Sequence, residues 1–378
     1  MLLGFLGNNG ARAALVLGLF GTIFALMQFY FSPLLGVISD RIGRRPVILI
    51  SNFGTAINYL IMALAPNVPW LFVGYAISGI TTASVITAYA YIADVTPPEK
   101  RAAAFGKVGA AFGLGFILGP AIGGVLGYAN IRLPFWVAAI VGLLNLAYGL
   151  FILPESLPVE KRSSEFSWKR ANPLGALKLL RSHLELWRLG AINFLLYVAH
   201  EVLPWVYALY VIERFGWNAR SIGLSLALVG VSSIIVSGGL VQPLVTRLGE
   251  RRTLITGIAF GAFGFFVFGA ATTGIVYLLA IPVFCLANVN GPAAQALMSF
   301  RVSQSEQGEL QGALGSLRGI AMMIGPLLFG GIYSLFIAHE ADWHLPGAPW
   351  YLAALLLLAA MLLAWQVSRE PVAWPSQA

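Results

Sequence analysis

The stretch Gly36-Val-Ile-Ser-Asp-Arg-Ile-Gly-Arg-Arg-Pro46 joins two long apolar segments, and a relative of it returns as Gln242-Pro-Leu-Val-Thr-Arg-Leu-Gly-Glu-Arg-Arg252. The two stretches are offset by 206 residues, and the same offset relates five glycines of 106–124 to five glycines of 312–330. A single offset held over more than eighty residues indicates two structurally equivalent halves.

The composition places both halves in a membrane. Hydrophobic residues make up 58% of the chain and charged residues only 10%, whereas a soluble domain has about 25% charged residues. We therefore expect an all-α membrane protein, and two parallel halves in such a chain are typical of a secondary transporter. Eleven apolar spans are long enough to cross a bilayer. They are roughly 13–38, 47–65, 70–93, 102–128, 134–153, 187–212, 221–245, 253–271, 275–300, 310–337 and 350–368.

The loops between the spans alternate in positive charge. Sixteen of the 23 Lys and Arg residues fall in one set of loops and four in the other. The positive-inside bias places the richer set in the cytoplasm. The net charge of +8 is therefore a topology signal, and we expect no nucleic-acid partner. We expect a multi-pass protein of a bacterial inner membrane.

The repeat also predicts how the chain is divided. We expect an N-terminal bundle over 1–153, a cytoplasmic linker over 154–186 and a six-helix bundle over 187–378. Shifted back by 206 residues, the span 187–212 would lie mostly before Met1. The first half then shows five helices of an expected six, so that eleven of twelve are visible. A start codon placed too late is the favoured explanation; a truncated gene and an eleven-helix protein are the alternatives.

The first stretch has the chemistry of a charged turn. Gly36 lets helices approach closely, and Gly43 permits a sharp turn. The forked donors of its arginines suit carboxylates or helix C-termini. A basic membrane-surface turn would explain any one arginine but not the whole string. The residues singled out are Gly36, Asp40, Arg41, Gly43, Arg44 and Arg45.

A second motif covers 109–124, where small residues recur every three or four positions. Such spacing makes one helix face flat and lets backbones touch, and the Gly-Pro pair introduces a bend. A dinucleotide fingerprint would need a preceding strand, which the sequence lacks. No phosphate-binding loop occurs, so we expect no cofactor and no ATP-driven transport. The packing residues are Gly109, Gly113, Gly119, Pro120, Gly123 and Gly124.

The first stretch resembles the signature loop of the major facilitator superfamily, in which an acid and arginines latch two helical bundles. That resemblance assigns Asp94 to the same latch. Segment 109–124 resembles the fifth-helix motif of proton-coupled drug exporters. Nearly the whole chain is similar to the tetracycline-resistance branch, as in Ser78-Gly-Ile-Thr81 and Gly325-Pro-Leu-Leu328. The resemblance implies a major facilitator fold of two pseudo-symmetric bundles, drug export driven by a proton gradient, and Gln28 in the substrate path.

The sequence departs from that branch at several polar positions. Tyr75 replaces an arginine of the branch, Ser233 a histidine and Phe260 an acid. In the second copy of the loop, Gln242 and Thr246 stand where Gly36 and Asp40 would, so we expect a one-sided latch. Proton coupling must then use other residues.

His200 and Glu201 form the outstanding ionisable pair inside a span, with Pro204 one turn later. Ionisable groups within a membrane are costly and usually functional, and the alternative is an inert hydrogen-bonded pair. Adjacent helical residues point about 100° apart, so we expect only one of the two to face a cavity. Either is a candidate for proton coupling.

Arg318 lies two turns into its span, where it could meet an anionic substrate, pair with Glu201 or reach the cytoplasmic surface. The other candidates for the substrate path are Gln28, Tyr75, Gln295 and Trp205. The chain shows no metal-ligand cluster and no nucleophile–base pair, and a His-Glu without a second histidine is no zinc motif. We therefore expect neither a metal site nor an enzyme.

The leading hypothesis is a monomeric, proton-coupled antiporter that exports small amphipathic compounds, as a multidrug or tetracycline exporter does, by alternating access. The alternative is a truncated or degenerate membrane protein that does not transport and serves as a scaffold or sensor. The replaced polar positions and the expected missing helix motivate that alternative.

Overall fold

A computed structural model of the chain describes residues 1–97, 100–162, 177–181, 184–303, 306–339, 343 and 345–367. Within these ranges the regular structure is helical, and no strand occurs. Eleven segments of the described chain are long and apolar enough to cross a membrane, which confirms the predicted all-α architecture. They are Gly10–Ile42, Arg44–Leu64, Val68–Val95, Ala111–Ala129, Leu133–Ile152, Leu184–Phe215, Ala219–Gly239, Glu250–Ala270, Gly274–Ser299, Glu309–Ala338 and Ala348–Trp365.

The chain forms two compact units. Unit 1 comprises Met1–Asn9, Leu19–Pro173 and Asn218–Gly223, and unit 2 comprises Gly10–Gly18, Leu174–Trp217 and Leu224–Ala378. The predicted bundles and these units differ in two short segments, because residues 10–18 group with unit 2 and residues 218–223 with unit 1. Residues 163–176 and 182–183 of the predicted linker lie outside the described residues.

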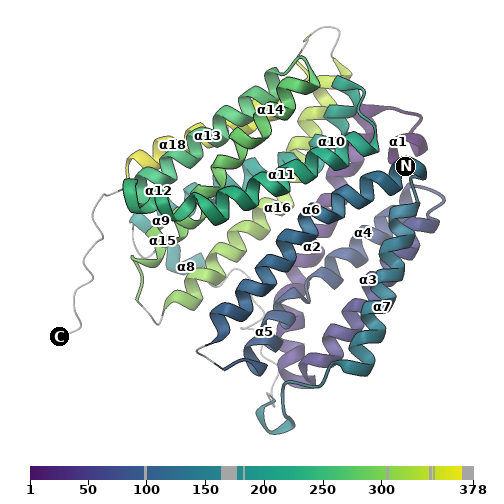
Figure 1. Cartoon of the computed structure of the whole chain (residues 1–378), viewed down its shortest axis with the longest axis vertical. Helices are drawn as coiled ribbons and strands as arrows, with labels where there is room; N and C mark the ends of the chain where they lie inside the picture. Colours follow the sequence, from purple (N-terminus) through teal and green to yellow (C-terminus); the bar gives the residue numbers. More distant parts are fainter. Residues whose placement is uncertain are drawn as a thin grey trace. The chain divides into compact units, whose positions relative to one another are not determined.

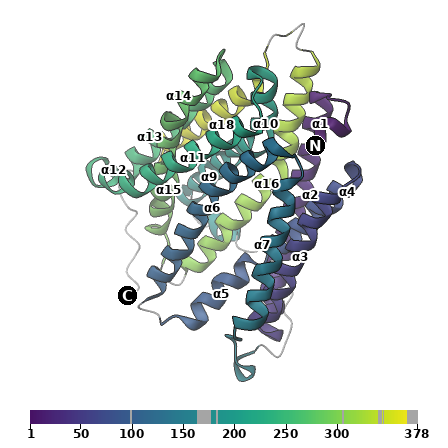
Figure 2. The same ribbon diagram turned by 45° about the vertical axis from the view of Figure 1, so that its right-hand side comes forward.

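In unit 1, α3 packs against both α4 and α7 (Figures 1 and 2). Small residues make these contacts close: the Cα of Ala56 on α3 lies 3.3 Å from where a Cβ on Gly142 of α7 would be. The helical segments of unit 1 are α1 (Leu2–Phe5), α2 (Gly10–Ile42, from Leu19 on), α3 (Arg44–Leu64), α4 (Val68–Thr82), α5 (Val85–Val95), α6 (Arg101–Ala129), α7 (Leu133–Ile152), η2 (Val159–Lys161) and the start of α11 (Ala219–Gly239, up to Gly223).

In unit 2, α13 packs against α14, α15 and α18, and α9 packs against α16 and α18 (Figures 1 and 2). The core between them is aromatic. Tyr277 stacks on Phe268 with ring centroids 4.3 Å apart, and Trp350 is fully buried beside both. The elements are α8 (Leu177–Leu180), α9 (Leu184–His200), α10 (Val202–Phe215), α11 (Ala219–Gly239, from Leu224 on), α12 (Val241–Leu248), α13 (Glu250–Ala270), α14 (Gly274–Cys285), η3 (Leu286–Val289), α15 (Asn290–Ser299), α16 (Gln307–Ala338) and α18 (Ala348–Trp365).

Large apolar side chains are exposed on several of the membrane helices. Phe151 on α7 is 85% exposed, and Leu279 on α14 and Leu362 on α18 are about two-thirds exposed. A soluble monomer rarely leaves apolar patches of this extent in water. Contact with lipid tails removes that cost, so these faces are the ones that meet the bilayer.

Candidate functional site

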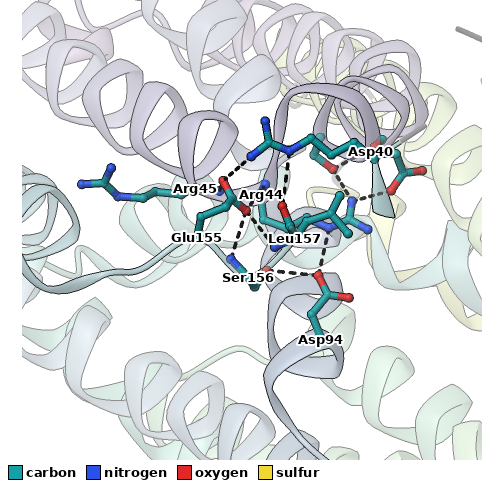
Figure 3. A network of polar contacts seen from close by, with 10 residues as sticks. Asp40, Arg44, Arg45, Asp94, Glu155, Ser156 and Leu157 are labelled. Carbon is teal, nitrogen blue, oxygen red and sulfur yellow. Dashed lines mark hydrogen bonds and ion pairs between the residues drawn. The ribbon is translucent and has the colours of Figure 1, made fainter. Parts of the chain in front are cut away.

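A network of charged side chains links the α2–α3 turn to the end of α5 (Figure 3). Arg44 is its centre: Nη1 lies 2.5 Å from the Asp40 carboxylate and donates to Ser39 Oγ, and Nε donates to Asp94 Oδ2 at 3.3 Å. Ser156 Oγ donates to the same Asp94 oxygen at 3.1 Å. Arg44 is only 11% exposed, so its guanidinium is held by two carboxylates with little access to water.

Glu155, which follows α7, closes the N-terminus of α3. The backbone N–H groups of Arg44 and Arg45 donate to its two carboxylate oxygens at 2.8 and 3.2 Å, and those of Ser156 and Leu157 donate at 3.0 Å (Figure 3). The first N–H groups of a helix have no partner within the helix, and a carboxylate there is favourable to the helix dipole. A residue 111 positions away thus supplies the cap of α3.

Gly43 is required by this cap for two reasons. Its backbone φ angle is 108°, which residues that carry a side chain rarely adopt. A Cβ at this position would also overlap the Glu155 carboxylate. The glycine that the sequence marked as a turn residue therefore also makes room for an acid from a distant part of the chain.

The remaining residues of the predicted latch have separate environments. The carbonyl of Gly36 accepts a hydrogen bond from Ser39 Oγ at 2.8 Å, and the side chain of Arg41 is exposed.

Arg45 Nη2 donates to the Leu150 carbonyl near the end of α7. Its repeat partner Arg251 donates in the same way to the Trp365 carbonyl at the end of α18. Each half thus uses the equivalent arginine to cap its last helix.

We expect the cap to make stability sensitive to acid. Burial of the Glu155 carboxyl raises its pKa, but the four backbone N–H groups together outweigh burial and hold the pKa below the ordinary glutamate value. Because the pKa is lower in the folded protein than in the unfolded chain, this contribution is complete above the ordinary glutamate pKa. It is lost as the pH falls through the lowered value.

Glu155→Ala should therefore lower the stability in detergent by about 1–3 kcal/mol at pH 7, and the loss should shrink below about pH 4. Thermal unfolding followed by intrinsic fluorescence measures both effects. Glu160→Ala, on the exposed η2 turn five residues later, is the matched control. Equal destabilisation by the two variants would contradict the capping role.

The small-residue segment of α6 forms a close helix crossing in unit 1. A Cβ on Gly124 would lie 2.7 Å from the Ala219 carbonyl oxygen and 2.8 Å from the Gly223 Cα, both at the start of α11. Within unit 2, a Cβ on the equivalent Gly330 of α16 would lie 2.7 Å from the Ala14 carbonyl oxygen and 3.3 Å from the Gly18 Cα of α2. The 206-residue repeat is therefore present in three dimensions as two glycine-mediated crossings.

The other predicted packing residues do not all share this role. Around the Cβ positions of Gly119 and Gly123 there is open space, and Gly109 and Gly113 are placed only as part of α6. Pro120 lies inside α6, and its carbonyl is where a Cβ on Gly223 would collide.

Unit 2 contains a cavity of about 500 Å³. Charged and polar side chains line it together with apolar ones, and His200, Glu201, Gln295 and Arg318 are among them. The His200 ring stacks on Phe284 with centroids 6.3 Å apart, and Gln295 Nε2 donates to Gln311 Oε1 at 3.4 Å. The further lining residues are Asn193, Leu196, Tyr197, Ser237, Gly261, Phe265, Phe284, Ala287, Asn288, Asn290, Gly291, Pro292, Leu314 and Leu357.

The expectation that only one of His200 and Glu201 faces a cavity is wrong, since both line it. The span is broken between α9, which ends at His200, and α10, which begins at Val202, with Glu201 between them. Pro204 accounts for the break, because it has no N–H to donate to the His200 carbonyl and its ring would clash there. Side chains that point about 100° apart can line one cavity of this size, so the two residues share it.

The other substrate-path candidates fall in different places. Trp205 Nε1 donates to Glu201 Oε2 at 3.1 Å, which ties it to the cavity in unit 2. Gln28 on α2 and Tyr75 on α4 belong to unit 1, where Tyr75 stacks on Phe20 with centroids 4.7 Å apart. Gln295 and Arg318 line the cavity in unit 2, Trp205 is bonded to one of its lining residues, and Gln28 and Tyr75 are not among the lining residues.

Sequence reasoning missed Glu155, Ser156 and the contact of Gly325 with Glu201. Glu155 had a usable signal: it is an acid just after a span, on the side of the membrane where the arginines of 41–45 lie. The contact of Gly325 had none, because it joins helices far apart in the sequence.

Comparison with known proteins identifies the architecture. The sequence pattern of the Major Facilitator Superfamily matches residues 5–326 and 191–378. The chain belongs to the Major Facilitator Superfamily. Members of this superfamily are membrane transporters rather than enzymes, and the chain is accordingly a multi-pass membrane protein of the bacterial inner membrane.

Two relatives within the superfamily are tetracycline resistance proteins. The class C protein of Escherichia coli is 36% identical over 347 residues, which cover 91% of this chain and 85% of that protein. The class G protein of Vibrio anguillarum is 37% identical over 340 residues, covering 90% and 85%. Among solved structures, the nucleoside transporter NupG is similar with a TM-score of 0.77 at 14% identity, covering 98% of this chain and 93% of that one. This last likeness concerns the fold alone.

Proposed function

We propose that this protein is a proton-coupled antiporter that exports small amphipathic compounds by alternating access, with the proton gradient as its energy source and no bound cofactor. The relatives named for tetracycline resistance support the export of drug-like compounds. The observation that carries the proposal is the cavity of unit 2, which is lined by an imidazole and an acid at a break in a membrane helix and by a guanidinium of α16.

The lining of the cavity suits an amphipathic molecule. Its volume of about 500 Å³ lies in the range of drug-sized sites. Phe265, Phe284 and Leu357 offer apolar surface, whereas Asn193 and Gln295 offer amide groups for a polar edge. A compound with an apolar ring system and a few polar substituents would satisfy both kinds of surface.

Glu201 is the group that can couple substrate to protons. As a carboxylate it attracts donor or cationic groups of a substrate, and as a neutral acid it does so far less. A proton and the substrate therefore compete for the same oxygens, which is the requirement for antiport. Arg318 lines the same cavity.

Everted membrane vesicles that contain the full chain test the proposal. With an acidified lumen, addition of tetracycline or of a cationic amphipath such as ethidium should release protons, measured with a pH-sensitive dye. Glu201→Gln should lower this release by about 100-fold, while Glu309→Gln, on an exposed acid of α16, should leave it unchanged.

The two parts of the proposal fail separately. Undiminished proton release in Glu201→Gln, with the protein present in the membrane, would remove Glu201 from the mechanism. Absence of release from the unaltered chain over a panel of amphipathic compounds would reject proton-coupled export.

A further inference from the structure

Gly325 on α16 lies directly against Glu201 at the break between α9 and α10. A Cβ on Gly325 would overlap the Glu201 Cβ and would lie 2.5 Å from its Cγ and 3.6 Å from its Cδ. We infer that Gly325 is a positioning residue: its missing side chain lets Glu201 seat against the backbone of α16 and holds the carboxylate in the cavity. This inference rests on the proposed role of Glu201 in coupling.

Gly325 lies on the same face of α16 as the residues of this helix that line the cavity. Arg318 and Gly325 are seven positions apart, which is two helical turns on the same side. Arg318 and Leu314 line the cavity, and Ala321 between Arg318 and Gly325 is fully buried. The helix thus places a cation at one level and an open space at another, and Glu201 occupies that space.

The collision that a side chain would cause cannot be relieved by rotation. The nearest atom of Glu201 is its Cβ, which stays fixed when the side chain turns about its bonds. Either α16 or the break would have to move by about an ångström to reach an ordinary Cβ contact. A shift of that size at a functional group can cost about 100-fold in rate. It would also strain the 3.1 Å bond from Trp205 Nε1 that fixes Glu201 Oε2.

The repeat supplies an internal comparison. Gly119 on α6 is the equivalent of Gly325, and around its Cβ position there is open space. In unit 2 an acid lies opposite the equivalent glycine, so Gly119 is a matched position without that contact. The ionisable groups that line the cavity beside Glu201 are His200, Tyr197 and Arg318.

Carbodiimide labelling of the purified full-length protein tests the inference without transport. Dicyclohexylcarbodiimide modifies protonated carboxyls in apolar surroundings, and mass spectrometry of the peptide that contains Glu201 gives the rate. Gly325→Ala should change this rate at pH 7 by more than about threefold. Gly119→Ala and Gly331→Ala, whose added Cβ atoms meet open space, should stay within about twofold. A change below threefold in Gly325→Ala would overturn the inference.

Two further variants separate positioning from folding and from the proposed function. If Gly325→Ala does not fold, the double variant Glu201→Gly/Gly325→Ala should restore the folded protein, because it removes the colliding Cβ; failure of this rescue would also overturn the inference. In transport assays, the double variant Glu201→Gln/Gly325→Ala should be less than about twofold slower than Glu201→Gln alone, because Gly325 acts through Glu201. If the losses of the two single variants instead add in the double variant, Gly325 acts on another part of the protein. Absence of transport by the unaltered chain would reject the proposed function, whereas labelling would still decide the role of Gly325.

Discussion

Gly124→Val is expected to remove most of the folded protein from the membrane. The added Cβ would lie 2.7 Å from the Ala219 carbonyl oxygen and 2.8 Å from the Gly223 Cα. Both are backbone atoms of α11 and cannot turn away, so the two helices must separate along their crossing. Overpacking of this kind costs about 1–3 kcal/mol in ordinary cores and more where the backbone itself is the obstacle. Fluorescence-detected gel filtration of membrane extracts measures the folded fraction.

The neighbouring residue provides the control for this prediction. Gly123→Val adds the same side chain to the same helix one position earlier, where there is open space. Its folded fraction and its unfolding temperature should match those of the unaltered chain. The repeat offers a second test, because Gly330→Val should be damaging while Gly331→Val should not. Similar yields for Gly123→Val and Gly124→Val would show that the crossing does not depend on the missing side chain.

Arg44→Ala is expected to produce the second large effect, on transport as well as on stability. The guanidinium holds Asp40, Ser39 and Asp94 together, and its removal takes from both carboxylates the cation that they share. Hydrogen bonds to charged groups contribute about 1.5–3 kcal/mol, but Asp40 is 39% exposed and Asp94 25% exposed, which weakens their share. We expect Arg44→Ala to lower the free energy that stabilises the closed network by about 2 kcal/mol. That corresponds to roughly a thirtyfold change in the equilibrium between the closed and the opened network.

Hydrogen exchange and transport assays measure this effect together. Amides at the start of α3 and the end of α5 should exchange faster in Arg44→Ala, and transport should fall with them. Arg41→Ala removes an exposed arginine three positions earlier and should change neither. Unaltered exchange at both helix ends would mean that the network is a surface feature without a structural role.

Much of the fold follows from the sequence because its signals are local or periodic. Each apolar span is a continuous run that must be helical in lipid, since no water is there to satisfy its backbone groups. The 206-residue offset also pairs the glycines of the two crossings, because a Cβ on Gly124 or on Gly330 would lie 2.7 Å from an alanine carbonyl oxygen of its own unit. The break at Glu201 has a local cause in Pro204, but the cavity that His200 and Glu201 both line is formed with residues of α13, α15 and α16, which lie far along the chain.

The sites were harder to predict because their contacts join distant segments. Glu155 caps a helix that begins 111 residues earlier, and no periodic pattern connects the two. The collision that reserves Gly325 for Glu201 likewise exists only once α16 lies against the break. A different rule singled out His200, Glu201 and Arg318, namely that ionisable groups are rare within apolar spans. This rule can be applied to the sequence without knowing which distant residues the group contacts.

The hydrogen bond from Trp205 to Glu201 has an optical consequence. The emission of an indole depends on the charge that its N–H meets, and here that N–H meets a carboxylate oxygen at 3.1 Å. Any event that changes the charge or position of this carboxylate should therefore change the tryptophan emission of the unlabelled protein. The chain contains 10 tryptophans, and subtraction of the Trp205→Phe spectrum isolates the one that reports on the cavity.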